Sequence, residues 1–383
     1  MMRAYLCCSA ALLLLASAPL LAQRARDLGV PFDGTPGPLN AITDIAGIDV
    51  GHTTLIDGAS IRTGVTVIFP RGKQSDDPSF GGWFSLNGNG EMTGTTWLEE
   101  SGFLDSPIFI TNTHSVGTVR DSYIRWQADH NRKPGTNSAG AGFWSLPVVA
   151  ETYDGFLNDT NGQHVQPQHV FDAIDHARSG PVPEGNVGGG TGMICFGFKG
   201  GIGTSSRIAG KYRVAALVQC NCGAKRQLTI AGVPVGRELD RSTVASVPRQ
   251  LEDRGSIIIV VATDAPLLPN QTKRLARRAS LGLARLGSTS GNGSGDIFIA
   301  FSTANPNTAK PSGELASVSM LPNDQMGPIF DATVQAVEEA IINAMVAARD
   351  MTGVSGHTVT ALPHDGLKQT LEKYNRLAQP AAR

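Results

Sequence analysis

The sequence predicts an α/β (α+β) protein in which helices cover the outer faces of a mixed sheet. Short, unbroken apolar runs rich in β-branched residues, such as residues 257–262, are typical of strands buried on both faces. Two helical patterns late in the chain follow or face such runs. One of them, residues 330–349, is apolar nearly all round, so we expect it to be covered on more than one side.

Composition narrows the class of protein further. The 383 residues are 41% hydrophobic and 17% charged, which is enough to bury one large core or two ordinary ones. The 45 Gly and 22 Pro follow no collagen-like period and indicate many turns and loops. A net charge of −1 provides no basic surface for nucleic acid or an anionic membrane.

Residues 1–22 have the pattern of a secretory signal peptide. Arg3 precedes an apolar stretch, and Ala22 offers a cleavage point before Gln23. The stretch is short for a membrane span and no basic stop-transfer cluster follows it. We therefore expect a secreted or periplasmic protein with no stable membrane insertion, whose single mature domain spans residues 23–383.

The first half of the mature chain begins with a Pro- and Gly-rich segment, residues 23–39, which predicts an extended arm. Alternating apolar residues predict a strand–turn–strand at residues 42–52. Further buried strands are expected at residues 65–70 and 107–111. Residues 115–129 place apolar side chains on one face and predict a helix.

The second half alternates buried strands with glycine-dense loops. Strands are expected at residues 193–198, 213–219, 257–262 and 297–301, and helices at residues 266–287 and 330–349. The glycine-dense segments 188–192 and 199–207 are expected to be loops that approach another strand or a ligand closely. Residues 237–254 are polar and charged, as in an exposed linker where a chain can be cut.

Cysteine and histidine spacing gives no sign of a metal or cofactor. Cys195, Cys220 and Cys222 remain after signal removal, so at least one thiol is free or pairs between chains. Cys220-Asn221-Cys222 lacks the C-x-x-C spacing of a zinc knuckle or redox pair. The His164, His169 and His176 set does not share one helical face, and the glycine loop at residues 86–94 matches no nucleotide-binding fingerprint. We expect no metal and no cofactor.

Ser256 opens the buried run 257–262 directly after Gly255. The chain has no Gly-x-Ser-x-Gly elbow, and no pattern sets a His beside a candidate serine. A cut between Gly255 and Ser256 would instead give Ser256 a free α-amine, whose ordinary pKa of about 7.7–8.0 lets it act as base for its own hydroxyl. An uncut chain would hold this base as an amide and be inactive.

The sequence resembles the β-aminopeptidase / L-aminopeptidase–D-amidase/esterase family of self-processing serine hydrolases. The resemblance runs in order over nearly the whole mature chain, at residues 42–52, 87–91, 149–152, 189–207, 218–236, 255–264 and 293–303. It implies a four-layer αββα sandwich, similar to N-terminal-nucleophile hydrolases but with distinct connectivity. It also implies a self-cut at Gly255-Ser256 into an α chain, residues 23–255, and a β chain, residues 256–383.

The resemblance implies a role for each matching residue. Ser256 would be the nucleophile, Asn221 would donate its amide to the oxyanion, and Ser294 would bond to Ser256. Asp296 would orient Ser294 or the α-amine, although some relatives carry Glu there. Glu151 would bind the substrate's N-terminal ammonium, with Tyr153 as a further pocket residue.

The expected activity is therefore that of an aminopeptidase or amidase on short peptides, amino acid amides or esters with an L-, D- or β-amino acyl group. The alternatives are an acyltransferase of the same fold group and a non-catalytic periplasmic binding protein. The resemblance also implies a homotetramer of αβ units, without nucleic acid. The intact mass would report signal removal and the internal cut together.

Overall fold

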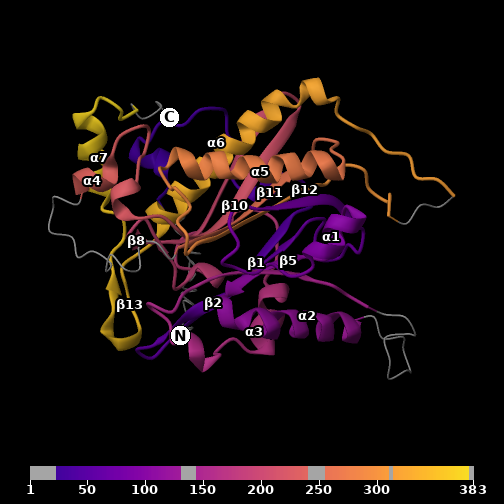
Figure 1. Ribbon diagram of the computed structural model, residues 1–383, viewed down its shortest axis with the longest axis horizontal. Coiled ribbons are helices and arrows are strands. Elements are labelled where there is room, and N and C mark those ends of the chain that lie inside the picture. The colour runs from indigo at the N-terminus through magenta and orange to yellow at the C-terminus, as the bar shows by residue number, and fades with distance from the viewer. Residues whose placement is uncertain (1–22, 131–143, 240–254, 310–313, 379–383) are drawn as a thin grey trace, which may run out of the picture.

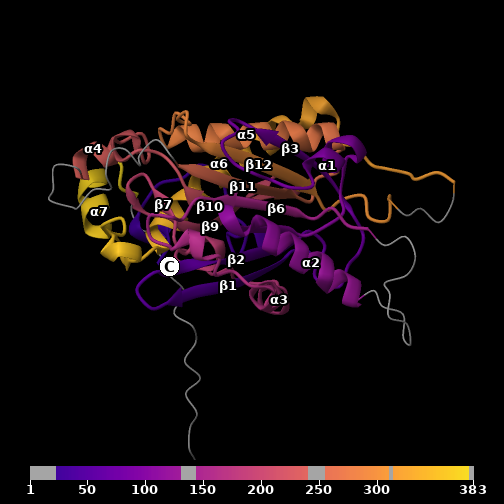
Figure 2. The same ribbon diagram turned by 60° about the horizontal axis from the view of Figure 1, so that its bottom comes forward.

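The computed structural model describes residues 23–130, 144–239, 255–309 and 314–378. These residues form two β-sheets that lie face to face, with helices on the outer side of each sheet (Figure 1). Figure 2 shows the four layers in order, from α5 and α6 through the two sheets to α2 and α3. The expected αββα sandwich is confirmed.

The first sheet has the order β1-β2-β5-β6. Its strands are β1 (Asp49–Asp57), β2 (Ile61–Phe69), β5 (Ile108–Asn112) and β6 (Val148–Thr152). Only β5 and β6 run parallel to one another. Helices α2 (Val116–His130) and α3 (Pro167–Asp175) cover its outer face, burying Val119 and Ile174 against strand residues such as Phe109.

The second sheet has the order β4-β3-β12-β11-β10-β9. Its strands are β4 (Phe103–Leu104), β3 (Ser79–Ser85), β12 (Gly295–Ser302), β11 (Ser256–Thr263), β10 (Tyr212–Asn221) and β9 (Gly201–Ala209). The parallel pair β11 and β12 occupies its middle, and every residue of both strands is buried. Burial on both faces explains why these strands read as unbroken apolar runs.

Two long helices cover the outer face of the second sheet. Helix α5 (Pro269–Arg285) packs on β3 and β12, whereas α6 (Gly327–Ala347) packs on β9 and β10 and against α5. Because α6 has neighbours on two sides, it is buried nearly all round, as its sequence predicts. Between the sheets, Ile110 and Ala150 of the first meet Leu217, Ile258 and Ile299 of the second.

The remaining elements lie at the ends and edges of the sandwich. They are α1 (Thr95–Ser101), α4 (Val235–Leu239), α7 (His364–Lys373), the short pairs β7 (Ile194–Cys195) with β8 (Phe198–Lys199) and β13 (Met351–Thr352) with β14 (Thr358–Val359), and short 3-10 turns. No helix in the described ranges is long and apolar enough to cross a membrane.

Three sequence-based expectations about strands and loops are corrected. Residues 42–52 are a 3-10 turn (Ile42–Asp44) followed by the start of β1, because β2 pairs with the segment only from Asp49 onward. Residues 193–198 form the turn of the β7–β8 pair instead of one strand. Most of the expected loop 199–207 is strand β9. Its glycines allow a close approach to α6 and do not mark a loop, because a Cβ on Gly203 would lie 2.0 Å from the Ala340 carbonyl oxygen.

The expectation that residues 23–39 form only an extended arm is also corrected. It contains a 3-10 turn (Ala25–Leu28) whose Ala25 and Leu28 are buried in the core shared with α6. The signal-peptide prediction at residues 1–22 and most of the predicted linker 237–254 lie outside the described residues.

Candidate active site

Ser256 is the first residue of β11 and lies between two strand ends. It pairs across the sheet with Asn221, the last residue of β10, and with Gly295, the first residue of β12. The Gly295 N–H donates a hydrogen bond of 3.1 Å to Ser256 Oγ, and the serine is only 4% exposed. The hydroxyl is therefore fixed by the register of three strands.

Asn221 presents a hydrogen-bond donor beside this serine. Its Oδ1 accepts a bond of 2.9 Å from the Ile194 N–H, which sets the orientation of the amide plane. The Nδ2 atom has no hydrogen-bond acceptor among the described residues. An amide held at its oxygen, with its N–H groups unused, is suited to bind a developing negative charge.

Ser294 and Asp296 flank Gly295. Ser294 Oγ donates a hydrogen bond of 2.6 Å to Asp296 Oδ1. Burial raises the pKa of Asp296, while the bond from Ser294 works in the opposite direction. Asp296 Oδ2 is buried and has no hydrogen-bond partner within the described ranges. The pair thus places one hydroxyl and one unused carboxylate oxygen at the start of β12, the strand that pairs with Ser256.

A glycine- and asparagine-rich segment between β3 and α1 holds the 290–296 loop in place. Asn87 Oδ1 accepts from the Asp296 N–H at 2.9 Å, and Asn89 Nδ2 donates to the Gly293 carbonyl at 2.7 Å. The two backbones touch so closely that a Cβ on Gly295 would lie 2.3 Å from the Asn89 carbonyl oxygen. Sequence reasoning assigned no role to Asn87 or Asn89; their Asn-Gly-Asn-Gly repeat is the signal that could have pointed to them.

Glu151 lies near the end of β6, on the other side of this segment. Its carboxylate accepts hydrogen bonds from the Glu91 N–H, at 3.0 Å, and from the Thr113 hydroxyl. A Cβ on Gly90 would lie 3.2 Å from Glu151 Oε1 and 3.1 Å from the Gly295 Cα. One glycine therefore separates the Glu151 carboxylate from the start of β12, the strand that pairs with Ser256.

Burial controls the charge of Glu151, which is 3% exposed. Desolvation raises the pKa of its carboxyl group, and the hydrogen bond from Thr113 is the largest effect in the opposite direction. The carboxylate has no Lys or Arg partner among the described residues, so a substrate ammonium would find an uncompensated negative charge. Thr113 was not singled out from the sequence, because its contact with Glu151 depends on the pairing of β5 with β6.

Tyr153 follows β6 directly but is 45% exposed. Its hydroxyl lies over Gly155, where a Cβ would be 2.2 Å away, and no described contact joins it to Ser256. The structure thus brings together Ser256, Asn221, Ser294, Asp296 and Glu151 at one end of the sandwich. The place of Tyr153 in a binding pocket stays a prediction.

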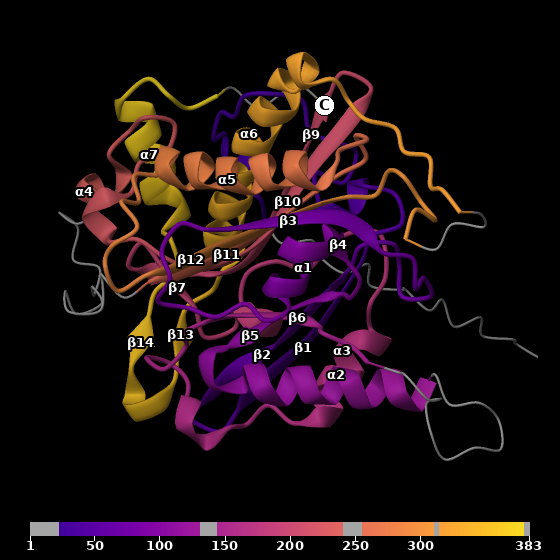
Figure 3. The same ribbon diagram turned by 45° about the vertical axis from the view of Figure 1, so that its right-hand side comes forward.

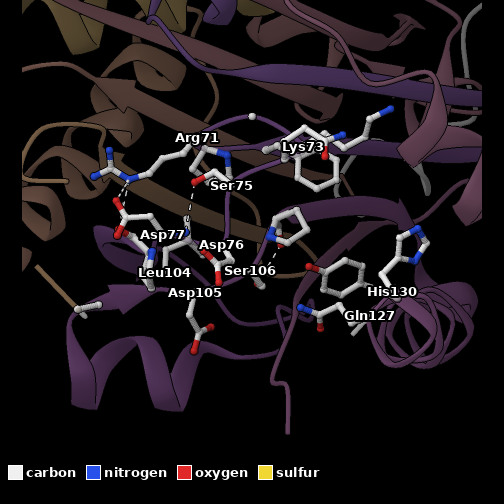
Figure 4. A pocket seen from close by; sticks show the side chains of 18 of the residues that line it. Arg71, Lys73, Ser75, Asp76, Asp77, Leu104, Asp105, Ser106, Gln127 and His130 are labelled. Carbon is white, nitrogen blue, oxygen red and sulfur yellow. Dashed lines mark hydrogen bonds and ion pairs between the residues drawn. The ribbon is translucent and has the colours of Figure 1, made fainter. Parts of the chain in front are cut away.

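A separate hollow of about 610 Å³ lies away from this site (Figure 4). Arg71, Asp105 and His130 line it, together with Ser106, which precedes β5. Because β5 and β6 are parallel, their starting ends lie opposite the end that carries Glu151. This hollow therefore does not belong to the Ser256 site.

The described residues provide no metal-binding group of three or more His, Cys, Asp or Glu side chains. No His is a described hydrogen-bond partner of Ser256. Burial lowers the pKa of His52 to about 4, and this neutral ring contacts Thr66 in the first sheet. The arrangement at Ser256 therefore lacks the imidazole base of a Ser-His-Asp triad.

Two solved structures share this architecture. The L-aminopeptidase D-Ala-esterase/amidase of Ochrobactrum anthropi, described as a prototype for the serine aminopeptidases and a new variant among the Ntn hydrolase fold, aligns with a TM-score of 0.85 and 46% identity over 93% of this chain and 99% of its own. A Burkholderia sp. β-aminopeptidase aligns with a TM-score of 0.82 and 48% identity over 92% and 99%. The fold and site define a peptide hydrolase with a variant of the N-terminal-nucleophile hydrolase fold.

Sequence comparison identifies the family. The Beta-peptidyl aminopeptidase BapA of Sphingosinicella microcystinivorans is 53% identical over 96% of this chain and 97% of its own length. The profile of Peptidase family S58 matches residues 40–359, and the chain belongs to that family. Family membership overturns the alternative of a non-catalytic binding protein.

Proposed function

We propose that this protein is an exported, self-cleaving serine aminopeptidase. It releases an N-terminal L-, D- or β-amino acyl residue from short peptides, amides or esters. The observation that carries this proposal is the position of Ser256 as the first residue of β11, between the free amide donor of Asn221 and the N–H of Gly295. The β-peptidyl and L-aminopeptidase names of the relatives support the substrate class.

Activation begins with hydrolysis of the Gly255–Ser256 bond. One water molecule is added, so that Gly255 gains a carboxylate and Ser256 gains an α-amine. A Cβ on Gly255 would lie 2.7 Å from the Cys222 Cα and 2.8 Å from the Asn221 carbonyl oxygen. The glycine thus lets the chain before Ser256 run close beside the end of β10. There the Asn221 amide can stabilise the oxyanion of the self-cleavage step as well as that of the later substrate reaction.

Turnover uses the new amine as the base. It accepts the proton of Ser256 Oγ as that oxygen attacks the substrate carbonyl carbon. The N–H groups of Asn221 bind the oxyanion, and the proton then passes to the departing amine as the C–N bond breaks. Water hydrolyses the Ser256 ester, which releases the amino acid and restores the hydroxyl. Asp296 Oδ2 and Ser294 are the groups we assign to orient the amine and Ser256.

Glu151 gives the reaction its preference for the chain terminus. Its carboxylate, one glycine away from Gly295, pairs with the substrate's N-terminal ammonium and so places the first amide carbonyl near Ser256. An internal peptide segment has no such ammonium and would leave the buried carboxylate unpaired, which is unfavourable. This explains an aminopeptidase instead of an endopeptidase.

The test combines processing with activity. Purified wild-type protein should show two bands under denaturing conditions, and the smaller should begin Ser-Ile-Ile-Ile. Ser256→Ala should remain one uncut, inactive chain, whereas the control Ser280→Ala, on helix α5, should be cut and active. An active wild-type protein that stays full length would overturn self-cleavage alone.

Substrate assays separate the proposed reaction from its alternative. β-Alanyl, L-alanyl and D-alanyl p-nitroanilides should release p-nitroaniline, and N-acetylated forms should not. Added amine acceptors would distinguish an acyltransferase, in which the acylated amine, instead of the free acid, is the main product. Absence of release from all three substrates would overturn the aminopeptidase proposal.

Export and assembly are further parts of the proposal. Removal of residues 1–22 would leave Gln23 as the first residue, and cell fractionation with N-terminal sequencing checks both. The proposed homotetramer of αβ units should appear in native mass spectrometry as four copies of each chain.

A further inference from the structure

Three buried cysteines lie directly behind the oxyanion donor. Cys195 is the second residue of β7, Cys220 lies in β10, and Cys222 follows Asn221. The sulfur atoms of Cys195 and Cys222 are 3.1 Å apart. This separation is shorter than that between sulfur atoms in ordinary packing contact.

The backbones next to these two cysteines are already joined. The Phe196 N–H donates to the Cys222 carbonyl at 2.6 Å, and the Ile194 N–H donates to Asn221 Oδ1 at 2.9 Å. These two bonds hold the segments on either side of the sulfur pair. A covalent link would therefore join side chains that the fold has brought together, with little movement of the backbone.

We propose that Cys195 and Cys222 form a disulfide that keeps the Asn221 amide in its working orientation. Cys195 follows Ile194, whose N–H holds Asn221 Oδ1, and Cys222 follows Asn221. The disulfide would close a covalent ring around this hydrogen bond. Its effect on catalysis rests on the role proposed for Asn221, whereas the existence of the bond does not.

The chemistry needs an external disulfide oxidant, such as oxidised glutathione or the active disulfide of a thiol oxidase. A thiolate attacks the oxidant to give a mixed disulfide, and the second cysteine displaces the oxidant's thiol. Two protein thiols and one external disulfide thus become one protein disulfide and two external thiols. Because the sulfur atoms are buried in the finished fold, the exchange belongs to the period of folding after export.

The surroundings favour ionisation of Cys195. Burial opposes it, but hydrogen bonding with Cys220 and Cys222 and the charge of Lys199 lower the pKa of Cys195 to about 5. Lys199 is itself fully buried, which lowers its pKa to about 7 although Cys195 acts in the opposite direction, and its Nζ donates to the carbonyls of Met193, at 2.8 Å, and Gly200, at 2.9 Å. Because these groups meet only in the folded chain, Cys195 is the sulfur we expect to ionise most readily when the folded protein lacks the disulfide.

The first test is a peptide map of the full chain, expressed with its leader into an oxidising compartment and alkylated in denaturant without reduction, so that buried thiols are accessible. We expect one linked peptide pair containing Cys195 and Cys222, and alkylation of Cys220 alone among the three. Reduction before alkylation should label all three. Labelling of all three without reduction, or a link through Cys220, would overturn the proposal.

The second test measures the consequence for Asn221. Cys195→Ser and Cys222→Ser should each lower kcat roughly tenfold with little change in KM, because the donor is then misplaced in the transition state. Wild-type protein that folds in a reducing compartment should show the same loss, because the buried sulfur atoms are then never linked. The control Cys220→Ser should keep both the linked peptides and the dependence of kcat on the compartment. Equal kcat for the linked protein and for the protein folded under reducing conditions would overturn the positioning role, while an enzyme inactive in every form would count against the proposed function.

Discussion

The role proposed for Asn221 depends on a hydrogen bond made by the oxygen of its side-chain amide. The Ile194 N–H occupies Oδ1, so the amide cannot rotate to present oxygen to a substrate without losing that bond. A fixed donor stabilises the transition state more than a mobile one, because the donor does not have to reorient when negative charge develops. The role of Asn221 is therefore testable through kcat.

Asn221→Ala should lower kcat by roughly 10²- to 10³-fold with little change in KM, because the lost bond forms chiefly in the transition state. Asn221→Asp keeps the size of the side chain and an oxygen for Ile194, but replaces the donor by an acceptor. It should be at least as inactive. Because Asn221 is also proposed to assist the cut, rates from steady-state kinetics are expressed per mole of processed chain. A raised KM with normal kcat would contradict the assignment.

The burial of Glu151 predicts how kcat/KM depends on pH. In its proposed role Glu151 must be ionised to bind the substrate ammonium, and burial raises the pKa at which the ionised form is lost. As pH falls through that raised pKa, kcat/KM of the wild-type enzyme should fall. The loss should begin at a higher pH than for an ordinary exposed carboxyl group.

The matched variant is Glu151→Gln, which keeps the shape and the hydrogen-bond acceptor for the Glu91 N–H. It should lower kcat/KM by roughly 10²-fold and narrow the gap between free and N-acetylated substrates. It should also remove the part of the acidic limb that the Glu151 carboxyl group causes, and leave the part caused by protonation of the Ser256 α-amine. An unchanged acidic limb would assign that limb to another group.

At the scale of elements, the segment 23–39 joins parts of the fold that self-cleavage would separate. Arg26 donates a two-pronged set of hydrogen bonds to Glu339 of α6, which also pairs with Arg207 of β9. Burial alone would raise the pKa of Glu339, but Arg26 and Arg207 outweigh it and lower this pKa. The N-terminal turn thus contributes an ion pair, Arg26 with Glu339, that links the proposed α chain to the proposed β chain.

Arg26→Ala should therefore lower the melting temperature by several degrees near neutral pH, since it leaves a buried carboxylate with one partner fewer. The lowered pKa of Glu339 contributes stability above the unfolded-state pKa, and this stability is lost as pH falls through the lower folded-state pKa. The difference between variant and wild type should shrink accordingly in acid. Calorimetry at two pH values measures it, and the exposed Arg349→Ala is the control; a constant difference would contradict the ionic origin.

At the scale of the whole molecule, self-cleavage would divide the chain in the middle of a sheet. Strands β11 and β12, which belong to the proposed β chain, lie between β10 and β3 of the proposed α chain (Figure 3). Helix α6, also from the β chain, packs on β9 and β10. Separation of the two chains would break two strand ladders and expose the central core.

We therefore expect the cut chains to remain together until the fold is denatured. Native mass spectrometry and gel filtration should show equal amounts of both chains in one particle. Uncut Ser256→Ala should elute at the same volume as the cut enzyme, because the ladders on both sides of β11 do not depend on the bond at Gly255. Elution of a separate β chain from native protein would contradict this.

The layered fold was largely predictable because its strongest signals are local. Buried strands such as residues 257–262 and 297–301, and the helix at residues 115–129, follow from apolar runs and a 3.6-residue period that each segment carries by itself. Strand β9 was missed because its glycines look like a loop, and they are required only where α6 presses on the sheet. The turn at residues 42–44 was missed because alternation alone does not show where a partner strand begins.

The sequence by itself determined which residues could act: a serine after glycine at the start of a buried strand, an asparagine at the end of another, and no histidine suitably placed. Only the tertiary structure decided that these residues meet, that Asn87 and Asn89 hold the neighbouring loop, that Thr113 holds Glu151, and that Cys195 reaches Cys222. The physical reason is that periodicity acts within a segment, whereas convergence of side chains depends on strand order and register between segments distant in the chain.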